Sequence, residues 1–461
     1  MLHKPVVKQI SGEEKSWTQI YSIIIVCLNS LVGGALFAWP SPSVPILLDE
    51  TQNPYKMTMT ELSYLAVIPP IATVVASPFV GGIIDIVGRK KAILSVTIPY
   101  VISLICCIIG GPLYVYYIAR IADGIGDACL FSALPCYVAE IATPKVRGRW
   151  GNSMALSMYL GQFMINSIGS FFSISNAACI LMLLPVLFML NFPVLPESPY
   201  WLLMRERTDE ARKSLQWLRG KENVEDELTQ LTADVKRQQS ETGRYIDLIK
   251  IPSNRKSACI VAAVRWIQNF CGAAAIAVYI QTIFRRSGSN LQAGTCSMIY
   301  NASCFTCSLI ASSVLDKLGR RLATILSCAA CSLVLFSQGA VFYINDETDL
   351  DLPGFSVLPL VLMVCYIISF SIGLGIVPTL LLSEMFSSSV KSKAFVVMNI
   401  NMGLSVAITA QVFALLLEYV GLYAIFWFYG LSTLISAFIC YFIIPETKGK
   451  TLEEIQQQFK K

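Results

Sequence analysis

The sequence predicts an all-α membrane protein with twelve transmembrane helices, arranged as two parallel-repeat six-helix halves. Hydrophobic residues make up 55% of the 461 residues and charged residues only 14%, whereas soluble proteins carry about 25% charged residues. Apolar runs of about 20 residues, the length that crosses a hydrocarbon core, recur along the chain. Short charged motifs also recur in the same order in both halves. Composition, run length and repetition therefore indicate the same fold class.

The apolar runs define the expected spans. We predict them at residues 17–39, 61–83, 92–110, 113–141, 150–172, 177–196, 258–284, 292–314, 322–344, 355–384, 393–417 and 422–444. The segment before the first span has no cleavage-site pattern, so we expect no removable signal peptide. The spans divide the chain into an N-terminal half (1–200), a cytoplasmic linker (201–256) and a C-terminal half with a cytoplasmic tail (257–461).

The basic residues predict the orientation. Of the 35 Lys and Arg residues, all fall on one side of the twelve spans except Lys56, Arg120, Arg265, Arg285 and Arg286. The positive-inside rule then places both termini in the cytoplasm. We expect Arg265 near the inner end of its span.

The linker is charged but also contains leucines at regular spacing. Leu215, Leu218, Leu228 and Leu231 recur at helical spacing within it, which predicts amphipathic surface helices. The linker has too few apolar residues for the core of a soluble catalytic domain.

The sequence gives little support for an enzyme active site or a metal site. The only histidine is His3, and neither HExxH nor GxSxG occurs. The CxxC pairs Cys304/Cys307 and Cys328/Cys331 fall on neighbouring spans at different expected depths, so we interpret them as packing residues. We therefore expect no enzyme, no cofactor and no metal. No run of residues suggests nucleic-acid binding, and the basic residues suit the cytoplasmic leaflet of the lipid bilayer.

Three groups of charged positions repeat in order. Asp85, Gly88 and Arg89 match Asp316, Gly319 and Arg320; Glu140 and Arg147 match Glu384 and Lys391; Glu197 matches Glu446. A parallel repeat of this kind is one of those that build secondary transporters.

These motifs carry a resemblance to a known family. In order they are G-x3-D-x2-G-R-K at 81–90, R-x3-G at 120–124, P-x-Y-x2-E-x6-R-G at 135–148, PESPYW at 196–201, Q-x3-G at 268–272, DKLGRR at 316–321, G-x2-P-x5-E at 375–384 and PETKGKTLEEI at 445–455. Together they resemble the sugar porter family of the major facilitator superfamily over essentially the whole chain. The chain looks most like the insect facilitated trehalose and glucose transporters.

The resemblance implies facilitative (uniport) transport of a hexose or trehalose by alternating access. It implies a small-molecule sugar substrate, no covalent chemistry, and function as a monomer in the plasma membrane. The charged repeats suggest a latch that closes the cytoplasmic side, because carboxylate–guanidinium pairs can re-form as helices shift. The gating candidates are Asp85, Arg89, Glu140, Arg147, Glu197, Asp316, Arg320, Glu384, Lys391 and Glu446.

The resemblance also implies a central sugar site of convergent amides and hydroxyls. Gln268 and Asn269 are the first candidates, followed by Tyr279, Asn301, Gln162 and Asn399. Other positions that are polar or aromatic in the family are occupied here by Ala155, Ala274, Cys304 and Thr379. The altered site leaves the identity of the sugar open.

A final group of ionisable residues lies within the fourth span. The spacing of Arg120, Asp123 and Asp127 puts them on one helix face, and each costs roughly 3 kcal/mol or more to insert. A structural charge cluster and a proton relay both explain them. The first span has no acidic residue, where proton-linked sugar porters carry one, and this favours facilitated diffusion. A proton-coupled sugar or polyol symporter using Asp123 and Asp127, and a non-transporting sugar sensor, remain alternatives.

Overall fold

The computed structural model describes residues 17–51, 53–240, 244–289, 291–348, 357–386 and 388–446. Inside these ranges a few helical side chains are not described, Asp316 and Lys391 among them. Every regular element within the described ranges is a helix.

The N-terminal half contains eight α-helices and one short 3-10 helix. They are α1 (Trp17–Ala38), α2 (Pro40–Leu47), α3 (Met59–Val87), α4 (Arg89–Ile109), α5 (Leu113–Ile141), α6 (Pro144–Trp150), α7 (Ser153–Phe171), α8 (Ile174–Asn191) and η1 (Phe192–Val194). Short helices then form the connection between the halves: α9 (Pro199–Met204), α10 (Thr208–Arg219), α11 (Glu225–Ser240) and α12 (Asp247–Lys250).

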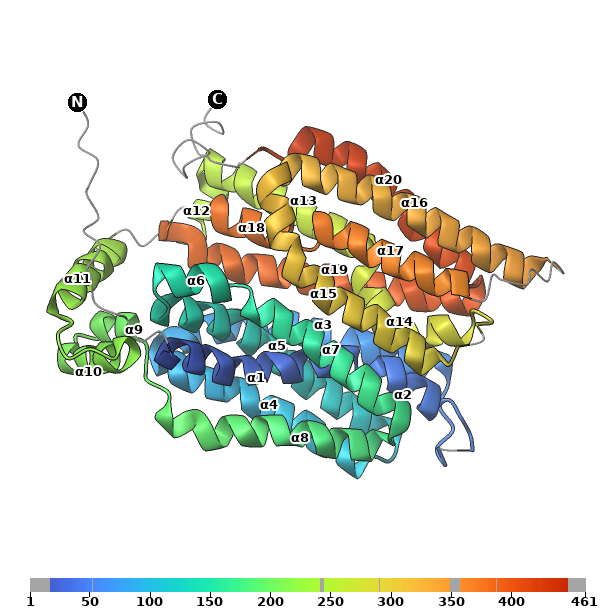
Figure 1. Cartoon of the computed structure of the whole chain (residues 1–461), viewed down its shortest axis with the longest axis horizontal. Coiled ribbons are helices and arrows are strands. Elements are labelled where there is room, and N and C mark those ends of the chain that lie inside the picture. Colours follow the sequence, from blue (N-terminus) through green and yellow to red (C-terminus); the bar gives the residue numbers. More distant parts are fainter. Residues whose placement is uncertain are drawn as a thin grey trace.

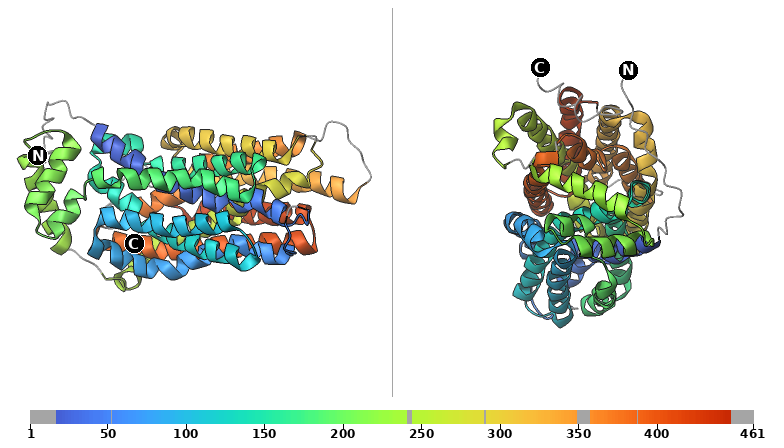
Figure 2. Two further views of the ribbon diagram at one scale, coloured as in Figure 1. Left: turned by 90° about the horizontal axis from the view of Figure 1, so that it is seen from below. Right: turned by 90° about the vertical axis from the view of Figure 1, so that its left-hand side faces the viewer.

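The C-terminal half follows with the remaining helices. They are α13 (Pro252–Phe270), α14 (Ala273–Arg285), α15 (Ala293–Leu318), α16 (Arg320–Glu347), α17 (Leu358–Ile372), α18 (Val377–Glu384), α19 (Ser388–Tyr419) and α20 (Leu422–Ile443). In Figure 1 the two halves lie one above the other, with α9–α11 at one end of the bundle. We call this the linker end, and the opposite end the far end. The view from the linker end shows the halves as separate groups of helices (Figure 2).

The apolar core follows the same division. One cluster of buried hydrophobic residues lies almost entirely within 23–218 and a second almost entirely within 248–444. A small third cluster, which includes Leu215 and Leu228, holds α9–α11 together. This agrees with the amphipathic spacing in the linker sequence. We propose the division at 1–200, 201–256 and 257–461 on this basis.

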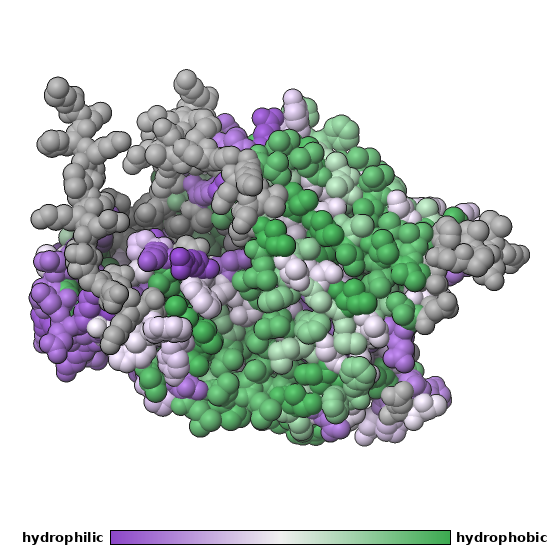
Figure 3. Space-filling model, viewed as in Figure 1, coloured by the Kyte–Doolittle hydropathy of each residue, from purple (hydrophilic) through white to green (hydrophobic). Residues whose placement is uncertain are grey.

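The exterior is that of a membrane protein. Ten described helical stretches are long and apolar enough to cross a membrane. With α7 and α15 they make up the twelve predicted spans. Figure 3 shows hydrophobic residues covering the long side of the bundle and hydrophilic residues gathered toward its two ends. The predicted fold class is therefore confirmed.

Some predicted spans differ from the structure. The first ends as predicted at Trp39, but a second helix, α2, continues the apolar stretch to Leu47. The seventh breaks at Gly272, between α13 and α14, and the tenth between α17 and α18. Helix α13 begins at Pro252 and not at 258, because its polar first turns are also helical. Arg265 lies within the Pro252–Arg285 stretch, and its place near the inner end of the span stays a prediction.

The linker helices are attached to the N-terminal half. Arg219 Nη1 donates to the Ile141 carbonyl oxygen at 2.9 Å, and Thr18 Oγ1 donates to the Leu218 carbonyl oxygen at 2.9 Å. Arg219 also pairs with Glu227 at 2.7 Å. Helix α10 is therefore fixed both to α11 and to the ends of α1 and α5.

Candidate functional site

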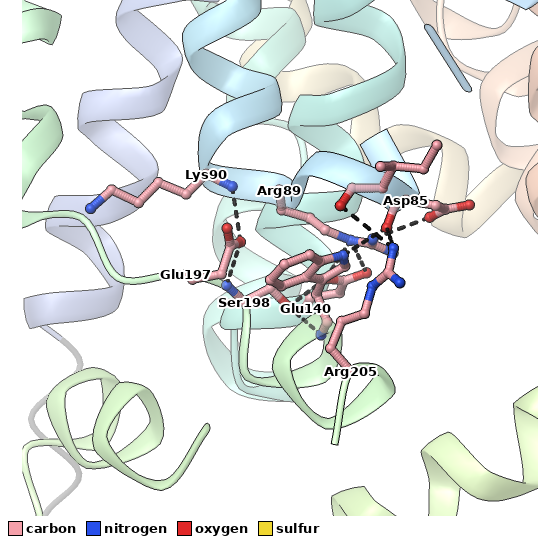
Figure 4. A network of polar contacts seen from close by, with 9 residues as sticks. Asp85, Arg89, Lys90, Glu140, Glu197, Ser198 and Arg205 are labelled. Atoms are coloured by element: carbon pink, nitrogen blue, oxygen red, sulfur yellow. Dashed lines mark hydrogen bonds and ion pairs between the residues drawn. The ribbon is translucent and has the colours of Figure 1, made fainter. Parts of the chain in front are cut away.

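The first candidate site is a charge network at the linker end of the N-terminal half. Arg89 Nε donates to both carboxylate oxygens of Glu140 at 3.1 Å, and Arg89 Nη1 lies 3.1 Å from Asp85 Oδ1. Figure 4 shows Arg89 between these two carboxylates. The Ser198 hydroxyl, at the start of α9, also donates to Glu140. The network therefore joins α3, α4 and α5 to the first linker helix.

Glu197 lies beside this network and has a different partner. Its Oε1 accepts from the backbone N–H groups of Lys90 and Ser198, each at 2.9 Å (Figure 4). A carboxylate at the start of α4 satisfies an orphan N–H group and suits the helix dipole. The approach requires Gly88, which has φ +100°, because a Cβ atom there would lie 2.5 Å from Glu197 Oε2.

The C-terminal half repeats this arrangement. Glu446 accepts from the backbone N–H groups of Arg320 and Arg321 at 3.1 and 3.2 Å, at the start of α16. Gly319 has φ +83°, and a Cβ atom there would lie 2.7 Å from Glu446 Oε2. Arg320 Nη2 pairs with Glu384 Oε1 at 2.9 Å. The sequence repeat is thus also a repeat of contacts.

The structure does not bring all the gating candidates together. Arg147 is exposed in α6 and makes none of the ion pairs found among the described residues; the carboxylate of Glu140 is bound by Arg89. The side chains of Asp316 and Lys391 lie outside the described residues. The ion pairs of Arg89 and Arg320 each lie within one half, not between the halves.

The second candidate site is the charged cluster inside the N-terminal half. Arg120 Nη1 pairs with Asp123 Oδ2 at 2.6 Å and also donates to the Leu36 carbonyl oxygen. Asp127 accepts from the Tyr100 hydroxyl of α4 at 2.7 Å. Asp123 is fully buried, and its Oδ1 has no partner. One guanidinium therefore faces two enclosed carboxylates, of which only Asp123 is paired with it.

The third candidate site surrounds the breaks in the seventh and tenth spans. Gln268 Oε1 accepts from Arg265 Nη1 at 2.9 Å, and Gln268 Nε2 donates to the Leu374 carbonyl oxygen between α17 and α18 at 2.9 Å. Asn269 points to α19, where its Nδ2 donates to Ser405 Oγ at 2.6 Å. The neighbouring candidates Gln268 and Asn269 thus face different helices.

The other predicted sugar ligands are spread over several helices. Tyr279 (α14) stacks on Phe413 with ring centroids 4.6 Å apart, and its buried hydroxyl has no partner. Asn301 (α15) has a partnerless Oδ1. Gln162 (α7) is buried and Asn399 (α19) half-buried; neither side chain makes a hydrogen bond to another described residue. Tyr279 and Asn301 therefore keep unused hydrogen-bonding capacity.

Two features were missed from the sequence. Arg265 lies against Thr379, the residue already noted as an altered position; Arg265 Nη2 donates to Thr379 Oγ1 at 3.1 Å. The halves are also linked away from the linker helices: Ser41 Oγ donates to Asn166 at 2.7 Å and accepts from Gln281 N at 3.4 Å, and Gln281 Nε2 reaches Ser170 Oγ at 3.2 Å. Serine, asparagine and glutamine at span ends carry no pattern that would have revealed this link.

The chain is similar to insect proteins described as facilitated trehalose transporters. The chain is 30% identical to a facilitated trehalose transporter of Polypedilum vanderplanki, over 98% of this chain and 93% of that protein. It is 31% identical to a facilitated trehalose transporter of Drosophila pseudoobscura pseudoobscura, over 96% of this chain but 51% of the relative. A relative from Aedes aegypti is 30% identical, and 55% of its length is covered. The chain thus spans about half the length of several of these relatives.

Solved structures show the same fold. The Escherichia coli xylose transporter, in a partially occluded inward-open conformation, matches with a TM-score of 0.78 at 19% identity, over 95% of this chain and all of that one. The same proton:xylose symporter bound to 6-bromo-6-deoxy-D-glucose matches with a TM-score of 0.75 at 21% identity, over 96% of this chain.

A sequence model of the family described as "Sugar (and other) transporter" matches residues 20–459. The match includes both six-helix halves, the charge network at the linker end and the broken spans. This is a family of transporters, not of enzymes, and its members move small molecules across membranes. The chain belongs to the sugar transporter family.

Proposed function

We propose that this chain is a facilitative transporter that moves a hexose or trehalose across the plasma membrane by alternating access. The observation that carries the proposal is the pair of repeated halves, the second of which holds polar side chains around Gln268 where two of its spans break. Several relatives are facilitated trehalose transporters, which makes trehalose the first sugar to test. We expect a monomer with both termini in the cytoplasm, because the basic residues gather at the linker end.

The repeated ion pairs support a gating role. Arg89 with Glu140, and Arg320 with Glu384, hold the linker end of each half in the described conformation. The Ser41–Gln281–Ser170 link joins the halves at the opposite end. In alternating access, rocking of the halves breaks the link at one end and lets charged side chains meet at the other. The gating roles of the remaining repeated charges are part of this proposal.

The sugar ligands are proposed on hydrogen-bonding capacity. Gln268 comes first because it borders both broken spans. Tyr279 and Asn301 follow because each buries a polar atom without a partner, which costs free energy unless a ligand or water satisfies it. Asn269, Gln162 and Asn399 complete the proposed set.

The test is uptake of labelled trehalose and glucose into proteoliposomes that contain the full chain. We expect saturable uptake of one of them, unaffected by a proton uncoupler and reduced at least tenfold in the Gln268→Ala variant. Gln230→Ala, at an exposed glutamine of α11, is the matched control and should transport like the wild type. Uptake that does not saturate, or that Gln268→Ala leaves unchanged, would contradict the proposal.

A proton-coupled symporter is the second candidate function. The observation that favours it is the enclosed pair Asp123 and Asp127, of which only Asp123 is bound to the single guanidinium. A carboxylate that no cation balances is a natural place for a proton in a membrane. If the uncoupler abolishes uptake and Asp127→Asn makes uptake insensitive to the proton gradient, coupling replaces facilitated diffusion. A sugar sensor would bind the sugar and show no flux.

A further inference from the structure

Arg265 is a buried cation that has no acidic partner among the described side chains. It is 9% exposed. Its terminal nitrogens donate to the neutral oxygens of Gln268 and Thr379, and its Nε has no acceptor. Among the side chains that the structure describes, no carboxylate lies within ion-pair distance of this guanidinium.

The other buried arginines behave differently. The described part of the chain buries Arg89, Arg120, Arg219 and Arg265. The first three each pair with a carboxylate, at distances between 2.6 and 3.1 Å. Buried charges in proteins are almost always paired, because an unpaired one loses its hydration with no compensation. Arg265 is therefore the exception that needs an explanation.

The groups around Arg265 also favour a negative charge beside its guanidinium. Its hydrogen-bond partner Thr379 lies in the first turn of α18, where the helix dipole is positive. Half-helix N-termini at broken spans typically face anionic substrate groups. Glu384, at the other end of α18, does not supply the charge, because Arg320 already holds it at 2.9 Å. Among the described side chains, the one charged group that contacts Gln268 and Thr379 is thus a cation.

We propose that the sugar carried by this chain bears one anionic group, a carboxylate or a phosphate, which binds the guanidinium of Arg265. The inference rests on the proposed function, since it assumes that a sugar binds beside Gln268. The planar guanidinium forms directional, paired hydrogen bonds with carboxylate and phosphate oxygens. Gln268 and the neutral ligands then bind the hydroxyl groups of the same sugar.

The experiment compares four labelled substrates in proteoliposomes of the full chain: glucuronate, glucose 6-phosphate, glucose and trehalose. We expect glucuronate or glucose 6-phosphate to be taken up in preference to both neutral sugars, and the preferred one identifies the anionic group. Removing one partner of a buried charge pair costs enough that Arg265→Gln should lower kcat/KM for the anion at least about 30-fold. Arg265→Gln should therefore lose the preference for the anion over glucose, and Arg265→Lys should keep part of it.

A stability measurement separates binding from transport. Arg265→Gln removes a charge that nothing balances, so without ligand the variant should have a higher Tm than the wild type. The anion should raise the Tm of the wild type and not that of Arg265→Gln. Arg255→Gln, at an exposed arginine of the same helix, is the matched control and should behave like the wild type in both assays.

The outcomes are distinguishable. Uptake of glucose or trehalose with neither uptake of the anions nor a Tm shift by them would overturn the anionic substrate and leave the proposed function intact. A Tm shift by the anion that is lost in Arg265→Gln, without flux of any sugar, would overturn the proposed function and support the anion site. A lower Tm of Arg265→Gln without ligand would show a structural role for the arginine and would also overturn the inference.

Discussion

Neutralising Glu140 tests the ion-pair network at the linker end. Arg89 has a side chain only 7% exposed, and Glu140, at 15%, is its better-buried partner. Breaking a buried pair costs about 3–5 kcal/mol. Arg89 would still form its ion pair with Asp85, so we expect Glu140→Gln to destabilise the described conformation by about 2–3 kcal/mol. At 1.4 kcal/mol per factor of ten, this shifts its equilibrium with other conformations by roughly 30- to 150-fold.

The assay is initial uptake rate against sugar concentration, normalised to the amount of inserted protein. Glu140→Gln should insert normally and change kcat/KM at least tenfold. Asp85→Asn is the internal control: its side chain is 64% exposed, and exposed pairs contribute about 0–1 kcal/mol. The Arg89→Gln/Glu140→Gln double variant should lose less than the sum of the single variants, because the two side chains interact. Uptake like the wild type in Glu140→Gln, or additive losses, would refute the reasoning.

Three further predictions concern the bundle interior. Asp123→Asn should lower the Tm strongly, because Arg120 loses the carboxylate that pairs with it and breaking a buried pair costs about 3–5 kcal/mol. Asp127→Asn should leave the Tm equal or higher, and the reverse order of the two Tm values would contradict the pairing of Arg120 with Asp123. Gly34→Ala should reduce the yield of folded protein, because the new Cβ atom would lie 2.1 Å from a backbone oxygen of α7, while Gly82→Ala meets nothing within 4 Å and should fold normally. Gln281→Ala removes one hydrogen bond between the halves, worth about 1 kcal/mol, and should change the uptake rate several-fold; an unchanged rate would count against the far-end link.

The fold was predictable because membrane insertion imposes simple rules. The lipid core requires apolar helices of fixed minimum length, so run length alone located the twelve spans. The breaks within the seventh and tenth spans were not predicted. Gly272 and Pro378 are compatible with either a kink or a continuous helix, and only packing against neighbouring helices decides between them.

The candidate sites were predictable to different degrees. The repeated motifs around Arg89 and Arg320 identified the charged residues, but not the partner of each. Arg147 follows Glu140 closely in the sequence, yet Arg89, 51 positions earlier, forms the ion pair. The spacing of Arg120, Asp123 and Asp127 on one helix face predicted their cluster correctly, because neighbours on a helix are fixed by local geometry. Pairing between helices has no such local rule.

The sequence by itself determined the membrane class, the helical fold, the two-half repeat and the family. These depend on composition, periodicity and motif order, which are properties of the chain read in one dimension. Only the tertiary structure decided that Glu197 and Glu446 bind helix N-termini and that Ser41 and Gln281 join the halves. It also decided that Arg265 lies buried beside Gln268, with no described carboxylate as its partner. Each of these depends on side chains that distant helices bring together, and a charge reveals its missing partner only when its neighbours in space are known.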